Sequence, residues 1–75
     1  MNEKIRAKIN LLLDEDKTFT DTDPLVSSGL LSSLKIIELA AWIEINYGVD
    51  FSKRAFNVYD FENITTIVNL INENN

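Results

Sequence analysis

The sequence predicts an all-α fold, a four-helix bundle with a short third helix and a long loop between its first two helices. Apolar residues recur at the three- and four-residue spacing of amphipathic helices in three stretches, residues 2–14, 34–47 and 61–74. A shorter helical turn is expected within residues 52–59. The main helix breakers stand between these stretches, at Pro24, Gly29 and Gly48. A chain of 75 residues buries one modest core, so we expect a single domain over residues 1–75.

The first predicted helix covers residues 2–14 and has one apolar side. Asn2 can cap its N-terminus, because a short polar side chain can accept a hydrogen bond from a free backbone N–H of the first turn. Leu11 widens the apolar side, which otherwise consists of Ile5, Ile9, Leu12 and Leu13. This spacing predicts a helix that buries one face in the core.

Residues 15–31 form a long connection that is rich in Asp, Thr and Ser. A loop of this length in a compact domain needs its own anchors. The loop contains five apolar residues that can pack down over the helices: Phe19, Leu25, Val26, Leu30 and Leu31. Its acidic residues do not fit a calcium loop, because Phe19 stands where the sharp turn requires glycine when the count begins at Asp14. We therefore expect solvated loop charges and no metal site.

The second predicted helix begins at Ser33, the expected N-cap, and ends before Gly48. It has two apolar stripes. The first is typical of a core face and consists of Ile36, Ala40, Ile43 and Tyr47, with Ile37 and Leu39 beside it. The second lies on the opposite side and consists of Leu34, Ala41 and Ile45 together with Glu38. In so short a chain the second stripe indicates a docking surface for other proteins.

The rest of the chain contains two further predicted helices. Ser52 can cap a brief third helix that extends through about Tyr59, and this helix is too short to form without tertiary contacts. The last helix runs from Phe61 to Asn74 and is capped by Asp60 or Asn63. Its core face consists of Ile64, Ile67, Val68 and Ile71. Trp42 lies between the two stripes of the second helix, where it covers the junction with the loop or contacts a partner.

Composition excludes several classes of function. The formal net charge of −5 argues against nucleic-acid binding, which requires a basic surface. No apolar run is long enough to span a membrane, and the first residues lack the pattern of a signal peptide. The chain contains no cysteine and no histidine, so disulfides are excluded and the commonest general base is missing. We expect a cytoplasmic, monomeric protein that is not an enzyme.

Three segments of the chain resemble the acyl carrier protein superfamily, which includes the peptidyl carrier proteins. They are residues 29–34 (Gly-Leu-Leu-Ser-Ser-Leu), residues 37–39 (Ile-Glu-Leu) and residues 47–49 (Tyr-Gly-Val). Ser33 aligns with the serine to which the family's phosphopantetheine is attached, and Ser32 replaces the aspartate that usually precedes it. Lys35 follows as in many peptidyl carriers. The resemblance covers nearly the whole chain, because residues 61–71 are similar to the family's last helix.

This resemblance implies a carrier that holds acyl or aminoacyl intermediates as thioesters on a 4′-phosphopantetheine covalently attached to Ser33. The implied partners are a phosphopantetheinyl transferase, an acyl- or aminoacyl-activating ligase, and downstream transferases or synthases. They are expected to dock on the second helix at Leu34, Lys35, Glu38, Ala41 and Ile45. Lys35, Ala41 and Ile45 on this docking face, with the modest net charge, favour a specialised biosynthetic pathway. A D-alanyl carrier for cell-wall polymers and a small helical adaptor without a cofactor are the alternatives.

Overall fold

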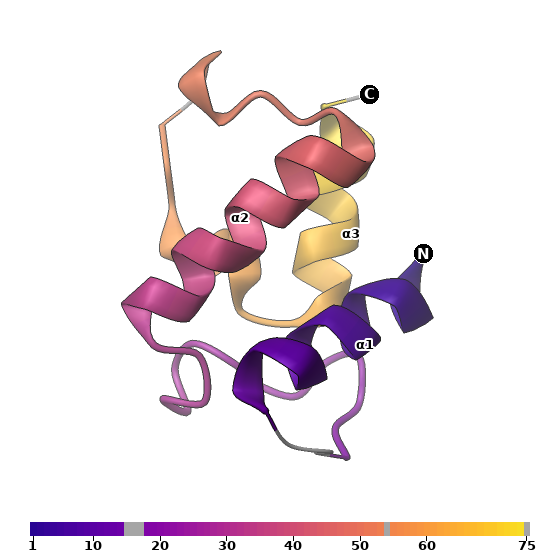
Figure 1. Ribbon diagram of the computed structural model, residues 1–75, viewed down its shortest axis with the longest axis vertical. Coiled ribbons are helices and arrows are strands. Elements are labelled where there is room, and N and C mark those ends of the chain that lie inside the picture. The colour runs from indigo at the N-terminus through magenta and orange to yellow at the C-terminus, as the bar shows by residue number, and fades with distance from the viewer. Residues whose placement is uncertain (15–17, 54, 75) are drawn as a thin grey trace.

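The computed structural model covers residues 1–75 and describes all of them except residues 15–17, 54 and 75. The described residues are all-helical, without a strand, in agreement with the predicted class. They form α1 (Asn2–Leu13), α2 (Ser33–Tyr47) and α3 (Ile64–Glu73), with two short 3-10 helices, η1 (Phe51–Lys53) and η2 (Val58–Phe61). Helix α1 packs against both α2 and α3, and η2 contacts the same two helices (Figure 1).

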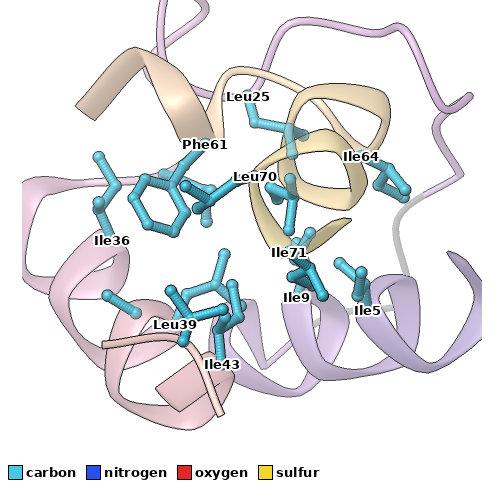
Figure 2. Close-up of a cluster of buried hydrophobic side chains, with 14 of the residues drawn as sticks. Ile5, Ile9, Leu25, Ile36, Leu39, Ile43, Phe61, Ile64, Leu70 and Ile71 are labelled. Carbon is cyan, nitrogen blue, oxygen red and sulfur yellow. The ribbon is translucent and has the colours of Figure 1, made fainter. Parts of the chain in front are cut away.

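The core between these elements consists of apolar side chains alone, as far as the structure describes it. Figure 2 shows side chains from α1, α2 and α3 gathered in one interior together with Phe61, which is fully buried. The aligned spacing of isoleucine and leucine on each helix produces this common interior. The largest fully buried side chains are Phe61, Ile5, Ile9, Leu25, Leu39, Ile43, Ile64, Ile67 and Ile71.

Helix α1 has the predicted core face, but its ends differ from the prediction. Asn2 does not cap the helix: Met1 is at the N-cap position, and the Asn2 amide donates a 2.9 Å hydrogen bond to the Asp21 carboxylate instead. The helix ends at Leu13, because Asp14 adopts a left-handed conformation with φ of 54°. Leu11, which was expected to widen the apolar side, is 73% exposed. It projects into solvent because it lies on a different side of the helix from the buried residues Ile5 and Ile9.

The connection between α1 and α2 is held down by its apolar residues, as predicted. Phe19, Leu25 and Leu31 are buried, and Val26 and Leu30 are partly buried against the same core. Part of this connection, including two residues of the acidic run at its start, lies outside the described residues. Hydrogen bonds add to the anchoring, and the backbone N–H of Thr65 donates to the Asp21 carbonyl at 3.1 Å.

The predicted third helix over residues 52–59 is wrong. The described part of this region forms η1 and η2, which do not join into one α-helix. Ser52 turns back on Asp50, to which its hydroxyl donates a 2.5 Å hydrogen bond, and η2 begins later, capped by Asn57. Ring packing holds Phe56 in place instead, since the centre of its ring lies 5.6 Å from the ring centre of buried Phe61. Tertiary contacts thus replace intrahelical hydrogen bonds here.

Helix α3 begins at Ile64, three residues later than predicted, because Asn63 caps it. The Asn63 side chain accepts a hydrogen bond from the Thr66 backbone N–H at 2.8 Å, and the Thr66 hydroxyl accepts from the Asn63 backbone N–H at 3.1 Å. This reciprocal pair is a capping box. Of the two predicted caps, Asn63 is therefore correct. The buried face consists of Ile64, Ile67, Leu70 and Ile71, with Val68 partly buried beside it.

Candidate functional site

The N-terminus of α2 differs by one residue from the prediction. Ser32, not Ser33, is the N-cap, with extended backbone angles and a side-chain Oγ that accepts a 3.3 Å hydrogen bond from the Lys35 backbone N–H. The position is set by Leu31, which is buried and whose backbone N–H donates to the Leu25 carbonyl. Serine and aspartate are both strong N-cap residues, so Ser32 can replace aspartate here without loss of capping.

Ser33 is consequently the first residue inside the helix, and it is exposed. Its hydroxyl forms no hydrogen bond with the residues that the structure describes. Two neighbouring serines are engaged: the Ser28 hydroxyl donates to the Pro24 carbonyl at 2.7 Å, and Ser32 caps the helix. Ser33 therefore presents a free hydroxyl at the surface.

The electrostatic setting of Ser33 suits a phosphate ester. The first turn of a helix has free backbone N–H groups and the positive end of the helix dipole, both of which favour an anion. The first turn of α2 contains no acidic residue, and Lys35 lies within it. Lys35 Nζ is 3.7 Å from a Glu38 carboxylate oxygen, so its charge is partly shared. A phosphodiester on the Ser33 hydroxyl would meet these donors without a competing carboxylate in the same turn.

Glu62 holds the loop that leads to this site, and the sequence analysis missed it. One carboxylate oxygen, Oε1, accepts hydrogen bonds from three consecutive backbone N–H groups, those of Leu25 at 3.1 Å, Val26 at 2.9 Å and Ser27 at 3.0 Å. Hydrogen bonds from Ser27 contribute most to holding the pKa of Glu62 below its ordinary value, and those from Val26 and Leu25 add to the effect. The partners are 35 to 37 residues away, so no local pattern indicates them.

The predicted docking residues of α2 lie together on its outward side. Leu34 is 63% exposed and Ile45 is 83% exposed, while Ala41 and Glu38 are also exposed and Lys35 is partly exposed. We call these five residues the outer face of α2. Ile37 was expected beside the core stripe, but it is 58% exposed and lies next to this face. The other members of the predicted core stripe are buried or partly buried.

Trp42 is partly buried, with neighbours at the end of α2 and on α1. It packs against the core edge, with its ring 5.6 Å from that of Tyr47 in an edge-to-face arrangement. Lys4 Nζ, from α1, lies 6.0 Å from the Trp42 ring centre and 5.8 Å from that of Tyr47. Trp42 therefore covers part of the contact between α1 and α2, with a cation above its ring.

The described part of the chain contains no group of three or more His, Cys, Asp or Glu side chains that could hold a metal ion. Within the same residues, no helix has the length and apolar character needed to cross a membrane.

The family follows from comparison with known proteins. A family model described as a phosphopantetheine attachment site matches residues 3–72. The chain belongs to this family and is a phosphopantetheine carrier protein. Comparison with curated proteins and with solved structures gave no match. The cofactor is 4′-phosphopantetheine, which the family attaches covalently to a serine, and such carriers interact with a phosphopantetheinyl transferase and with biosynthetic enzymes. A free, exposed serine at the N-terminus of α2 fits this requirement.

Proposed function

We propose that Ser33 carries the phosphopantetheine and that the protein tethers acyl or aminoacyl groups for the enzymes of a specialised biosynthetic pathway. The observation that supports this most is the free Ser33 hydroxyl on the first turn of α2, beside two serines whose hydroxyls are engaged in hydrogen bonds. Phosphopantetheinylation followed by intact-protein mass spectrometry tests the assignment. Material purified from the native host would also show the cargo.

The carrier's own residues bind and position, and partner enzymes carry out the chemistry. When bound, the phosphopantetheine supplies a terminal thiol that this cysteine-free chain lacks. Lys35 and the N–H groups of the first α2 turn hold the phosphate end, while Glu62 keeps the preceding loop in place. We propose no catalytic role for Ser33, because a serine nucleophile requires an adjacent base and the chain has no histidine. The absence of phosphopantetheine from protein made in the native host would instead favour an adaptor.

The outer face of α2 is the proposed docking surface for the transferase, the loading ligase and the downstream enzymes. Any enzyme that receives the arm must approach Ser33, and Leu34 is the next residue along the helix. Apolar groups covered by a partner contribute roughly 25 cal/mol per Å² before the cost of association. Glu38 adds charge steering, which salt weakens. Docking is therefore proposed to depend on apolar contact more than on charge.

This surface gives a prediction with a matched control. Ile45→Glu should lower kcat/KM for transfer to or from the cognate enzyme by about tenfold, because a charge at a docking anchor commonly costs more than 1 kcal/mol. Leu11→Glu introduces the same charge at a 73% exposed leucine on α1, which is not part of the outer face of α2, and should transfer at the wild-type rate. Both variants should keep the helical circular-dichroism spectrum and the thermal midpoint of the wild type.

The contribution of charge is measured separately with Glu38→Gln. This variant should slow association at low ionic strength and match the wild type at high salt, because exposed charges are screened beyond about 10 Å at 0.1 M salt. Wild-type transfer by Ile45→Glu, together with severe impairment of Glu38→Gln at every salt concentration, would show that docking is electrostatic and contradict the proposed surface.

A further inference from the structure

A groove lies along α2 on the side of the segment that follows it. After Tyr47 the chain turns back over α2 to η1, and residues 55–57 then lead down to η2 (Figure 1). Phe51 and Phe56 of this segment face α2 across the groove. The space between the segment and α2 has a volume of about 350 Å³. It is lined by Ile37, Ala40, Ala41, Glu44, Phe51 and Phe56. We call it the Glu44 groove, because Glu44 provides its only charged side chain among the described residues.

The shape of the Glu44 groove depends on small residues on one wall and rings on the other. Ala40 and Ala41 leave space along α2 that larger side chains would fill. Phe51 and Phe56 form the opposite wall, with ring centres 5.9 Å apart, and both pack on buried Phe61. Because Phe61 anchors this wall, the groove is a formed feature of the fold. Its lining is suited to a small apolar group.

The position of the groove matches the reach of an arm attached to Ser33. Ile37 follows Ser33 by one helical turn, and Glu44 lies about 16 Å along the axis at a rise of 1.5 Å per residue. An extended phosphopantetheine arm spans a comparable length. The groove lies outside the core, in which Ile36, Ile43 and Ile67 are buried. A cargo on the arm can therefore reach the groove without opening the core.

The charge at the far end of the groove is negative, because Glu44 lies there. Glu44 is exposed and forms no ion pair with the residues that the structure describes. It lies in the last turn of α2, where the negative end of the helix dipole also favours a cation, and this turn contains no basic residue. An apolar groove that ends in a carboxylate is complementary to a small apolar group that bears an amine.

We propose that the Glu44 groove binds the loaded end of the arm and selects aminoacyl cargo, with the apolar side chain between Phe56 and Ala41 and the cationic amine at Glu44. This inference rests on the proposed function, because it requires the arm to be on Ser33. The groove needs only weak intrinsic affinity, since a short tether gives an effective concentration in roughly the millimolar range. The groove thereby holds a short cargo against the outside of α2 until a partner docks.

The test compares two cargoes that differ only in the amine. The arm is loaded enzymatically with amide-linked analogues that carry a valyl group or a 3-methylbutanoyl group, and the mass of each product is verified first. NMR chemical shifts of Ile37, Ala41 and Phe56 are then compared with those of the unloaded arm. An exposed ion pair changes occupancy by up to about fivefold, so the valyl shifts should exceed the 3-methylbutanoyl shifts by up to that factor.

Three variants assign the effect to the groove. Glu44→Gln should make the two cargoes equivalent, whereas Glu38→Gln removes a carboxylate on the outer face and should leave their difference intact. Ala41→Phe should fill the groove and abolish the shifts for both. Equal shifts in the wild type, or shifts at Ile36, Ile43 and Ile67 instead, overturn the inference and leave the carrier function standing. A wild-type chain that accepts no arm overturns the proposed function and this inference with it.

Discussion

Replacing Ser33 with alanine is expected to abolish phosphopantetheine addition completely. A broad-specificity phosphopantetheinyl transferase with coenzyme A should add one phosphopantetheine mass to the wild type and none to Ser33→Ala, as measured by intact-protein mass spectrometry. The reason is that the phosphoester forms on the Ser33 hydroxyl, which lies free and exposed at the first turn of α2. Ser28 and Ser32 present hydroxyls that already make hydrogen bonds within the fold.

Because Ser32 and not Ser33 caps α2, removal of the Ser33 hydroxyl can be studied without loss of the helix cap. Ser33→Ala should leave the free energy of unfolding nearly unchanged, because Ser33 is inside the helix, where alanine is a strong helix former. Ser32→Ala should cost about 0.5–2 kcal/mol in chemical denaturation, because it removes the N-cap. Ser32→Ala and Ser28→Ala should both accept the arm. Addition to Ser33→Ala at the wild-type level would place the attachment site elsewhere.

The sequence predicted those parts of the fold that depend on local periodicity. The core faces of α1, α2 and α3 follow from the spacing of isoleucine and leucine, and the burial of Phe19, Leu25 and Leu31 follows from their apolar character in a polar loop. The predicted third helix was wrong because the rings of Phe51 and Phe56 pack on Phe61, which the short pattern of this segment does not reveal. Helix ends shifted by a few residues where one capping side chain prevailed over another.

The candidate site also has a part that could be predicted from the sequence and a part that could not. Ser33 and the outer face of α2 were found from one helix and its N-terminal motif, which are contiguous in the chain. Glu62 and the Glu44 groove were not, because both depend on segments that meet only in the folded protein. Ile37 shows the limit within a helix, since an isoleucine next to the core stripe can equally line a surface groove. Periodicity assigns a face but does not show what lies opposite it.

Acid should loosen the loop before α2 through Glu62. The folded protein holds the pKa of this carboxyl below the ordinary value of 4.5, so its contribution to stability is complete at neutral pH and is lost as the pH falls through the lowered pKa. The pKa values of Asp21, which receives hydrogen bonds from Asn2 and Arg6, and of Asp50, hydrogen-bonded by Ser52, are lowered in the same direction. In NMR titrations the amide signals of Leu25, Val26 and Ser27 should shift together, with one midpoint below 4.5.

Replacing Glu62 should disturb both the loop and the modification of Ser33. Glu62 accepts from the Leu25 N–H, the Leu25 carbonyl accepts from the Leu31 N–H at 2.9 Å, and Leu31 precedes the cap of α2. Glu62→Leu leaves the Val26 and Ser27 N–H groups without their acceptor, while the Leu25 N–H keeps only its hydrogen bond to the Glu62 backbone carbonyl. Hydrogen exchange in residues 25–27 should therefore accelerate and the thermal midpoint should fall. Phosphopantetheinylation should slow through a higher KM, because the transferase then meets a less ordered loop beside Ser33.

Glu62→Gln distinguishes positioning from general instability. Its amide oxygen can still accept the three hydrogen bonds, more weakly than a carboxylate, so it should restore most of the modification rate and abolish the shared titration of the three amides. Glu73→Gln, which removes an exposed carboxylate at the end of α3, should match the wild type in exchange, titration and modification. Wild-type exchange rates at residues 25–27 in Glu62→Leu would show that the carboxylate does not hold this loop. Unchanged kinetics of modification in a loosened loop would show that Ser33 is positioned by Ser32 and the core of α2 alone.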